Sequence, residues 1–386
     1  MHVEANRAAW IEIDLNCIDY NIKEIINKVG DASKIMGVIK SDAYGHGAVK
    51  IAKLLSDNGI HSFAVATLPE AMELRKAGFT SEELVPFCLA PDSLTETIVE
   101  YDLTPLVCSL ENAHLISQIA SEKGKTISGY IAVDTGMGRI GYNPDSSDAL
   151  DEILQMSKLE NFKIKGLFSH MSTADETDKK ETYLQLERYK KVIDALEKAN
   201  IDIQFKHVSN TAAIIDLKEL GFNMVRLGIG LYGHYPSDEV SKEVELKPAM
   251  KLKTIITNIK TVAPGTKVSY GYTYEFKEAS TLATLAIGYA DGFDRTQNNP
   301  KVMINGVLCD VVGRICMDQC MVKIPEGLNV NIEDEVLIMG AEVGVTAEDL
   351  ASRRGTINYE VLCSVSRRVT RDYNLGDKTY SKCYLY

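Results

Sequence analysis

The chain has 386 residues, of which 45% are hydrophobic and 25% are charged, and its formal net charge is −12. This composition is typical of a globular protein, and the length exceeds that of a usual single domain, so we expect two domains. The negative charge argues against a nucleic-acid-binding surface, which normally is basic.

Neither a membrane span nor a disulfide framework is predicted. No stretch approaches the roughly 18 uninterrupted apolar residues that span a bilayer, and residues 1–7 lack the apolar region of a signal peptide, so we expect a cytoplasmic protein. The eight cysteines are scattered through apolar segments, which favours reduced thiols. Cys316 and Cys320 are spaced like a metal-binding pair, but no histidine lies nearby, and we expect no metal.

In chain order, the first elements are a strand at 9–15 and a helix at 18–29. Short apolar runs then alternate with amphipathic stretches, the pattern of repeated βα units. Eight strands are predicted, at 34–40, 61–66, 84–89, 104–108, 127–133, 163–170, 203–208 and 223–228. Helices are predicted between them, at 48–55, 69–77, 147–156 and 180–198. Eight strands are the number that closes a parallel barrel.

From about residue 236 the pattern changes to alternating Val, Ile and Thr with turn glycines, and helical patterning is sparse. Strands are predicted at 251–261, 281–288, 302–309, 314–323 and 334–339. The predicted fold is therefore α/β, with an N-terminal (β/α)8 TIM-like barrel over 1–240 and a C-terminal all-β domain over 241–386. The first ~12 residues, which include the start of the leading strand, are candidates to join the second domain.

Lys40 ends an apolar run and is followed by a polar, glycine-rich turn at 41–47. A lysine at the carboxyl end of a buried strand is held rigidly and is partly desolvated, which lowers the pKa of its amine and favours condensation with a carbonyl. The alternative is a lysine that extends its amine to water from a strand end. This segment alone favours neither interpretation.

Further polar residues follow other predicted barrel strands. Arg139 follows the fifth, His170 ends the sixth, Asn210 and Thr211 follow the seventh, and Arg226 ends the eighth, with Gly228 and Ile229 just beyond. Active-site groups of such barrels gather at the carboxyl ends of the strands, so these residues are predicted to converge. His170 can also be an ordinary core histidine, and the Asn-Thr pair can merely cap a helix.

Residues 38–47, VIKSDAYGHG, resemble the signature of bacterial alanine racemases, whose lysine carries pyridoxal 5'-phosphate (PLP). The resemblance runs nearly end to end, from WIEIDL at 10–15 to RVTR at 368–371. It implies a PLP-dependent isomerase that interconverts L- and D-alanine and supplies D-alanine for peptidoglycan. It also implies a homodimer with shared active sites. Ser41 stands where the family usually has alanine.

Racemisation needs an acid/base group on each face of the α-carbon. Lys40 supplies one, and the string VSYG at 268–271 resembles the family segment that bears a catalytic tyrosine, here Tyr270. In the family this tyrosine is donated by the partner subunit. Without the resemblance, Tyr270 reads as an ordinary strand residue before a turn glycine.

The resemblance also implies the remaining contacts of the site. Cofactor contacts are implied for Lys40, Tyr44, His170, Asn210, Thr211, Arg226, Gly228, Ile229 and Tyr359, and substrate contacts for Arg139, Tyr289, Met317 and Asp318. The His170 ring would stack on the cofactor. Arg226 would donate a hydrogen bond to the pyridine nitrogen, because a guanidinium is never a proton acceptor, and the weakened electron sink would favour racemisation.

One departure concerns substrate specificity. The family usually has a lysine, often carbamylated, at the position of Ala132, where it holds the substrate-binding arginine. Arg139 must then be held by another group, which leaves a serine or broad-specificity racemase as an alternative. A third hypothesis is a non-catalytic PLP-binding protein. Thr370 also replaces a usual proline.

Overall fold

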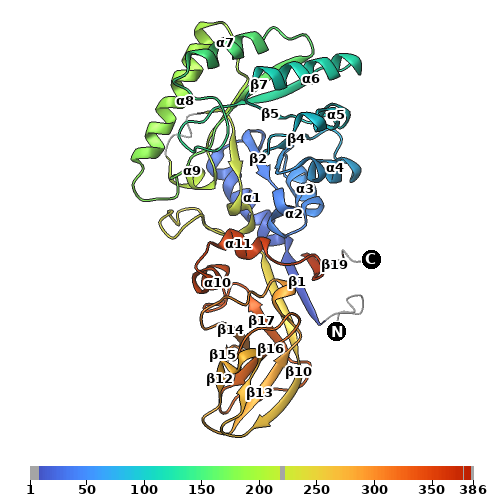
Figure 1. Ribbon diagram of the computed structural model, residues 1–386, viewed down its shortest axis with the longest axis vertical. Coiled ribbons are helices and arrows are strands. Elements are labelled where there is room, and N and C mark those ends of the chain that lie inside the picture. The colour runs from blue at the N-terminus through green and yellow to red at the C-terminus, as the bar shows by residue number, and fades with distance from the viewer. Residues whose placement is uncertain (1–7, 218–221, 377, 384–386) are drawn as a thin grey trace. The chain divides into compact units, whose positions relative to one another are not determined.

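The computed structural model describes residues 8–217, 222–376 and 378–383 (Figure 1). Contacts divide the chain into two compact units. The barrel unit comprises Asp19–Ala43 and Gly47–Leu246, and the β-rich unit comprises Met1–Ile18, Tyr44–His46 and Lys247–Tyr386. The short segment Tyr44–His46 thus belongs to the β-rich unit although barrel sequence flanks it. Among the described residues, no helix is both long and apolar enough to cross a bilayer.

The barrel unit is built on parallel strands in two four-stranded ladders, ordered β4-β3-β2-β9 and β5-β6-β7-β8. The strands are β2 (Ile35–Val38), β3 (Ser62–Val65), β4 (Glu83–Pro86), β5 (Leu106–Val107), β6 (Ile127–Ala132), β7 (Phe162–Phe168), β8 (Phe205–His207) and β9 (Val225–Leu227). Thr104 N donates to Leu84 O at 2.9 Å, and Arg226 N donates to Ser209 O at 3.0 Å. These two bonds join the ladders at both edges, so the TIM-like barrel predicted from the sequence is confirmed.

Helices flank these strands, as Figure 1 shows. They are α1 (Leu15–Val29), α3 (Ala48–Asp57), α4 (Leu68–Lys76), α5 (Thr95–Glu100), α6 (Leu110–Glu122), α7 (Ser147–Met156), α8 (Lys180–Lys198) and α9 (Thr211–Asp216), whereas the segment labelled α2 (Lys40–Tyr44) is a left-handed turn. Short 3-10 turns are η1 (Ala32–Lys34), η2 (Asp92–Leu94) and η3 (Ile229–Tyr232). In α8 the buried residues Tyr189, Ile193 and Leu196 recur at intervals of three and four, which places one apolar face against the strands.

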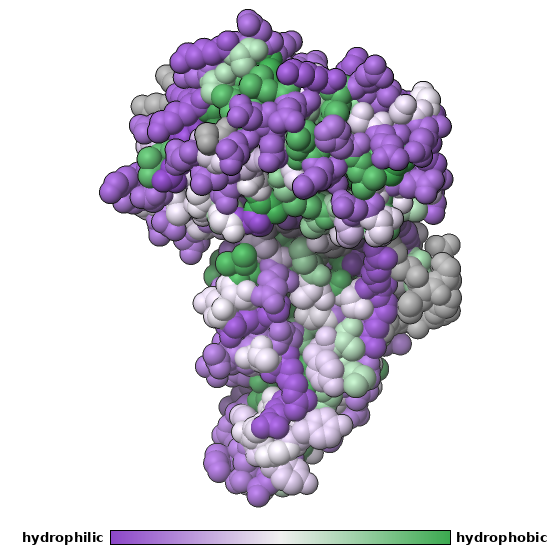
Figure 2. Space-filling model, turned by 45° about the horizontal axis from the view of Figure 1, so that its top comes forward, coloured by the Kyte–Doolittle hydropathy of each residue, from purple (hydrophilic) through white to green (hydrophobic). Residues whose placement is uncertain are grey.

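The barrel core is apolar because parallel strands covered by helices are buried on both faces. All four residues of β2 are buried, and Phe63, Phe162 and Phe168 are almost inaccessible to solvent. Hydrophilic residues predominate on the visible surface in Figure 2, and apolar residues there form separate patches.

The β-rich unit contains a closed ring of six strands. The ring runs β10-β13-β16-β15-β14-β17 and returns to β10, because β10 pairs with both β13 and β17. The strands of the unit are β1 (Ala9–Asp14), β10 (Met250–Val262), β11 (Lys267–Val268), β12 (Tyr274–Glu275), β13 (Ser280–Leu285), β14 (Lys301–Ile304), β15 (Val307–Val311), β16 (Cys320–Ile324), β17 (Glu335–Met339), β18 (Thr370–Leu375) and β19 (Lys378–Lys382). β1 lies antiparallel to β10 and parallel to β18. Residues 1–7, which the sequence placed with this leading strand, lie outside the described residues.

Several features of this unit differ from the prediction, and the strand expected at 314–323 begins only at Cys320, as β16. The single strand expected at 302–309 is a hairpin of β14 and β15, because Asn305 and Gly306 adopt positive φ angles of 49° and 77° and reverse the chain. The unit also contains two helices, α10 (Ala347–Arg354) and α11 (Asn358–Cys363), besides the turns η4 (Tyr270–Tyr272) and η5 (Tyr289–Asp291). A capping box of Thr346 and Asp349 starts α10.

Candidate active site

Lys40 lies two residues beyond β2, at the start of a left-handed turn. Ser41, Asp42, Ala43 and Tyr44 have φ angles of 53° or 54°, a conformation that costs an L residue roughly 1–2 kcal/mol. Asp42 fixes the end of the turn, since its Oδ1 accepts from Ala48 N at 2.8 Å and its carbonyl accepts from Gly47 N at 2.8 Å. The half-buried Lys40 is therefore joined to a tightly held backbone.

Arg226 is the centre of a buried network. It is 2% exposed, and its two Nη nitrogens donate to three carbonyls and two imidazoles. The acceptors are Ser169 O at 2.8 Å, His207 O at 2.9 Å, Val208 O at 3.1 Å, and Nδ1 of His207 and of His170, both at 3.0 Å. Because a guanidinium only donates, both Nδ1 atoms accept, and we infer that each neutral ring carries its proton on Nε2.

Electrostatics keep both imidazoles neutral. Burial and the charge of Arg226 lower the pKa of His207 and of His170 well below the usual 6.5. Arg139 and Lys40 lower the pKa of His170 further, so their charges act on the same ring. Burial lowers the pKa of Arg226 itself to about 9, which leaves it charged at neutral pH. The barrel unit thus brings Lys40, Arg139, His170 and Arg226 together.

A second group surrounds the ends of β8 and β9. Asn210 caps α9, since its Oδ1 accepts from Ala213 N at 3.1 Å. Thr211 Oγ1 accepts from Gly228 N at 3.0 Å and lies 3.5 Å from Gly230 N. A Cβ at Gly230 would lie 2.7 Å from Thr211 Cγ2, so only glycine fits this close approach. The predicted Ile229 is buried between these two glycines.

Ser209 Oγ is an orphaned atom of this region, as is Nε2 of His207. Both are buried, and within the described residues neither has a hydrogen-bond partner. A buried hydroxyl without a partner is costly, so an acceptor or donor from outside the protein would stabilise this region.

Arg139 follows β6 and is exposed. The turn before it is fixed by Asp134, whose Oδ1 accepts from the backbone N–H groups of Gly136 and Gly138, both at 3.0 Å. Ala132 is buried at the end of β6. Its methyl group offers no polar contact to an arginine.

The other predicted residues lie in the β-rich unit, where Tyr270 is 64% exposed. It follows Ser269, whose φ of 63° turns the chain and whose Oγ donates to Arg314 O at 2.5 Å. The Arg295 guanidinium carbon lies 5.9 Å from the centre of the Tyr270 ring. The phenol is therefore presented outward from a fixed backbone.

Tyr289, Met317 and Asp318 lie on two loops joined by backbone hydrogen bonds. Tyr289 N donates to Cys316 O, and Ala290 N donates to Met317 O, both at 3.1 Å. Arg368 then ties Asp318 to the buried Asp291, since its Nη2 lies 2.7 Å from Asp318 Oδ1 and its Nε lies 2.8 Å from Asp291 Oδ1. These predicted substrate residues are thus held as one group.

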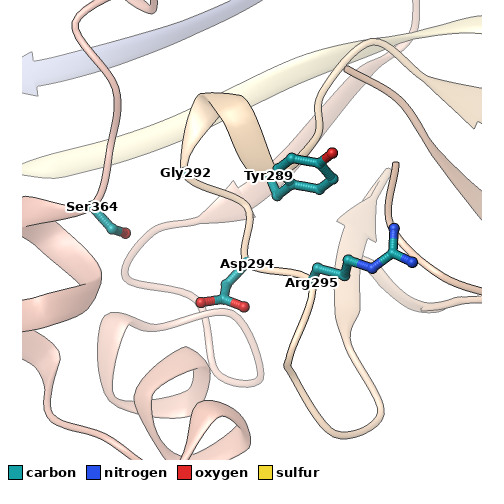
Figure 3. Close-up of a pocket in the computed structure, with 5 residues that line it drawn as sticks. All are labelled: Tyr289, Gly292, Asp294, Arg295 and Ser364. Atoms are coloured by element: carbon teal, nitrogen blue, oxygen red, sulfur yellow. The ribbon is translucent and has the colours of Figure 1, made fainter. Parts of the chain in front are cut away.

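A pocket of the β-rich unit opens beside Tyr289 (Figure 3). Its lining consists of Tyr289, Gly292, Asp294, Arg295 and Ser364. In Figure 3, Tyr289 comes from the short turn η5, the adjoining loop brings Asp294 and Arg295, and Ser364 comes from the end of α11. Arg295 thus lines this pocket and also lies over the ring of Tyr270, the predicted base.

Tyr44 and Tyr359 are neighbours in the β-rich unit, with ring centroids 6.0 Å apart. Burial raises the pKa of Tyr44 well above its usual value, so its hydroxyl stays protonated at neutral pH. A protonated phenol can donate a hydrogen bond to an anionic oxygen.

Sequence reasoning missed His207, Arg295 and Arg368. His207 sits in a short strand that gave no signal beyond apolar neighbours, and its role depends on Arg226, which is distant in sequence. Arg295 and Arg368 act through loops whose proximity only the folded chain reveals.

Comparisons with known proteins agree with this arrangement. The model of the alanine racemase N-terminal domain matches residues 13–236, and that of the alanine racemase C-terminal domain matches residues 249–373. Alanine racemase 1 of Clostridium acetobutylicum is 46% identical over 371 residues, which cover 95% of each chain. Among solved structures, alanine racemase of Clostridium difficile 630 is 46% identical with a TM-score of 0.94, covering 98% of this chain and 99% of that one.

A third similar structure is alanine racemase from Bacillus anthracis with bound L-Ala-P. It is 32% identical, with a TM-score of 0.92 and coverage of 98% of both chains. Two family models that together span most of the sequence, and relatives near half identity over nearly full length, lead to one conclusion. The chain belongs to the alanine racemase family.

Proposed function

We propose that this protein is a PLP-dependent alanine racemase, an isomerase that interconverts L- and D-alanine, with Lys40 and Tyr270 as its two acid/base residues. The observation that carries the proposal is the buried Arg226, which shares the strand ends with Lys40 and with a neutral His170. Family membership supports the reaction.

The residues present fit an anionic cofactor such as PLP. Within the described residues Arg226 is paired with carbonyls and imidazoles rather than with a carboxylate, so its charge lacks a protein counterion. Thr211, Gly228 and Ile229 would hold the phosphate, together with Asn210 at the start of α9. Tyr44 and Tyr359 would add hydroxyl donors.

Bound PLP supplies an aldehyde for a lysine amine and a ring that stabilises negative charge at the α-carbon. Lys40 Nζ removes or returns the α-proton on one face, and Tyr270 Oη serves the other face. Arg226 stays charged and only donates, so it would leave the cofactor's pyridine nitrogen unprotonated if PLP were bound against it. Arg139, Met317 and Asp318 orient the substrate carboxylate, and Tyr289 limits the room for its side chain.

Shared sites in a homodimer form a second part of the proposal. Tyr270, Tyr272 and Met317 are 64%, 68% and 53% exposed, which is unusual for large apolar side chains unless a partner covers them. A second copy of the chain would cover this face and would receive Tyr270 beside its own Lys40.

A mixing experiment tests the shared site. Lys40→Ala and Tyr270→Phe are each expected to have very low activity as pure proteins. After unfolding and refolding together, random pairing gives hybrid dimers in which one site keeps both residues, so about a quarter of the sites should recover activity. No recovery, with dimers present by light scattering, would show that each site takes both residues from one chain.

Ala132 favours a second candidate, a serine or broad-specificity racemase, because it leaves Arg139 without the usual supporting group. A chiral assay of the PLP-loaded protein against alanine, serine, lysine and arginine decides between the two. Alanine should have the highest kcat/KM. A non-catalytic PLP-binding protein would show no exchange of the α-proton with heavy water for any of them.

The central test compares wild type with Lys40→Ala. The variant should lose both the visible absorbance of lysine-bound PLP and at least about a thousandfold in activity. Lys53→Ala, at an exposed lysine of α3, is the control and should change neither. An active Lys40→Ala variant would refute the assignment.

A further inference from the structure

Glu70 lies in the first turn of α4, directly after β3, and its two carboxylate oxygens have different partners. Oε2 accepts from Ala66 N at 2.6 Å and from Thr67 N at 3.3 Å. Oε1 accepts from the backbone N–H of Ser41 at 2.8 Å. The bonds of Oε2 are those of an ordinary helix cap. The bond of Oε1 joins α4 to a loop 29 residues away, next to Lys40.

The bond to Ser41 closes the strand pairing that ends at Lys40. β2 and β3 are parallel neighbours, and their ladder continues through Ile39 N, which donates to Ala64 O at 2.8 Å. Beyond this point the backbone turns left-handed at Ser41, and no strand partner is available for its N–H. The carboxylate of Glu70 takes that place with a charge-assisted bond, a stronger type than a bond between neutral groups.

The turn needs such support because four successive residues, 41–44, have positive φ. Its far end is fixed by the bonds of Asp42 to Gly47 and Ala48. Its near end is fixed by Glu70, whereas the Ser41 side chain is exposed and adds little packing. Loss of the Glu70 bond would let the residues around Lys40 relax toward ordinary backbone angles.

We propose that Glu70 is a positioning residue for Lys40: its carboxylate fixes the Ser41 backbone and so sets the placement of the Lys40 amine. The inference rests on the proposed function of Lys40. It predicts that Glu70 affects the rate of the chemical step and the capture of PLP, and affects substrate binding much less.

The decisive variant is Glu70→Ala, and two control variants lie in the same element. Thr67→Ala weakens the cap of α4 but leaves the Ser41 bond, and Glu73→Ala removes a carboxylate one turn farther along. Glu70→Gln keeps one acceptor oxygen and should restore part of the function. All four retain the buried residues of α4, so folded protein is expected for each, with circular dichroism as the check.

The first readout is hydrogen exchange of the peptide covering 39–46 in the PLP-free protein. Glu70→Ala should speed exchange at the Ser41 amide by roughly tenfold or more, because its acceptor is gone. Thr67→Ala and Glu73→Ala should match wild type there. Equal exchange in wild type and Glu70→Ala would overturn the proposal.

The second readout is steady-state kinetics with PLP titration. Glu70→Ala should lose roughly 10- to 100-fold in kcat and roughly tenfold in PLP affinity, with KM for alanine within about threefold. If Glu70→Ala and Thr67→Ala had the same kcat, Glu70 would act only as a helix cap. If the proposed function of Lys40 were wrong, Lys40→Ala would bind PLP as wild type does. The exchange experiment would still decide whether Glu70 fixes Ser41.

Discussion

Nη2 of Arg226 lies 3.0 Å from Nδ1 of His170, and the direction of that hydrogen bond decides what the imidazole can do. The guanidinium must donate, so the Nδ1 lone pair is occupied and the ring stays uncharged. His170 is therefore unsuited to act as a general acid from that nitrogen. His170 can instead serve as a flat, neutral ring of fixed orientation.

Replacing Arg226 by lysine should destabilise the PLP-free protein by about 2–4 kcal/mol, because one ammonium cannot reach all the carbonyls and imidazoles that the guanidinium satisfies. Urea unfolding measures the loss. The control is Arg188→Lys, whose arginine is only partly buried and donates from Nη1 to Thr135 O at 3.0 Å. If the free energy of unfolding fell by the same small amount in both variants, the network around Arg226 would contribute little to stability.

His207 should make stability depend on pH. Its pKa is well below 6.5 in the folded protein and near 6.5 when unfolded, so below that pH only the unfolded chain binds the proton. The free energy of unfolding should then fall as pH drops below 6.5, by up to about 1.4 kcal/mol per pH unit from this residue. His207→Gln keeps an acceptor for Arg226 but does not titrate, so its decline should be shallower.

Urea unfolding of PLP-free protein between about pH 5 and 8 gives both slopes. Carboxylates contribute equally in wild type and variant, so the difference isolates His207. His114→Gln, at an exposed histidine of α6, is the matched histidine control. Parallel curves for wild type and His207→Gln would contradict the prediction.

Removing the hydroxyl of Thr211 should weaken PLP binding by roughly tenfold, since Thr211→Val keeps the shape but leaves Gly228 N without its acceptor. Thr211→Ser retains the hydroxyl and serves as the matched control. Spectroscopic titration of PLP-free protein measures the two affinities. Identical affinities for the valine and serine variants would mean that the hydroxyl has no part in the phosphate site.

Tyr270→Phe should lower racemisation by roughly 10²- to 10⁴-fold, the range of a lost general acid/base. The losses in kcat/KM must be equal in the two directions, because the two enantiomers have the same free energy. The asymmetry appears instead in heavy water, where one enantiomer should still exchange its α-proton through Lys40. Tyr272→Phe, at an exposed neighbour, is the control. Equal loss of exchange from both enantiomers would argue against two separate bases.

The barrel could be predicted because its strands are continuous apolar runs that end in polar residues, as β2 does before Lys40. The hairpin at β14 and β15 contained its own signal, the Asn305-Gly306 pair, which an uninterrupted apolar pattern on both sides concealed. The capping box of Thr346 and Asp349 likewise indicated the start of α10. Hydrophobic periodicity alone therefore does not reveal a tight turn or a helix cap.

The positions of Lys40, His170 and Arg226 could be predicted to converge, but their hydrogen bonds could not. The bond of Glu70 to Ser41 depends on a left-handed turn that no residue in the sequence demands, since glycine is absent from 41–44. The neutral state of His207 likewise depends on burial and on the position of Arg226. Such features follow from tertiary packing, which overrides local preference.

The placement of β1 has a consequence for biosynthesis. This strand leaves the ribosome before the barrel strands, whereas its neighbours β10 and β18 are made after them. Until then both its edges stay bare and open to mispairing with other chains. All barrel strands are therefore made before β1 can pair with β10 and β18, and a product truncated before β10 would leave both edges of β1 unpaired.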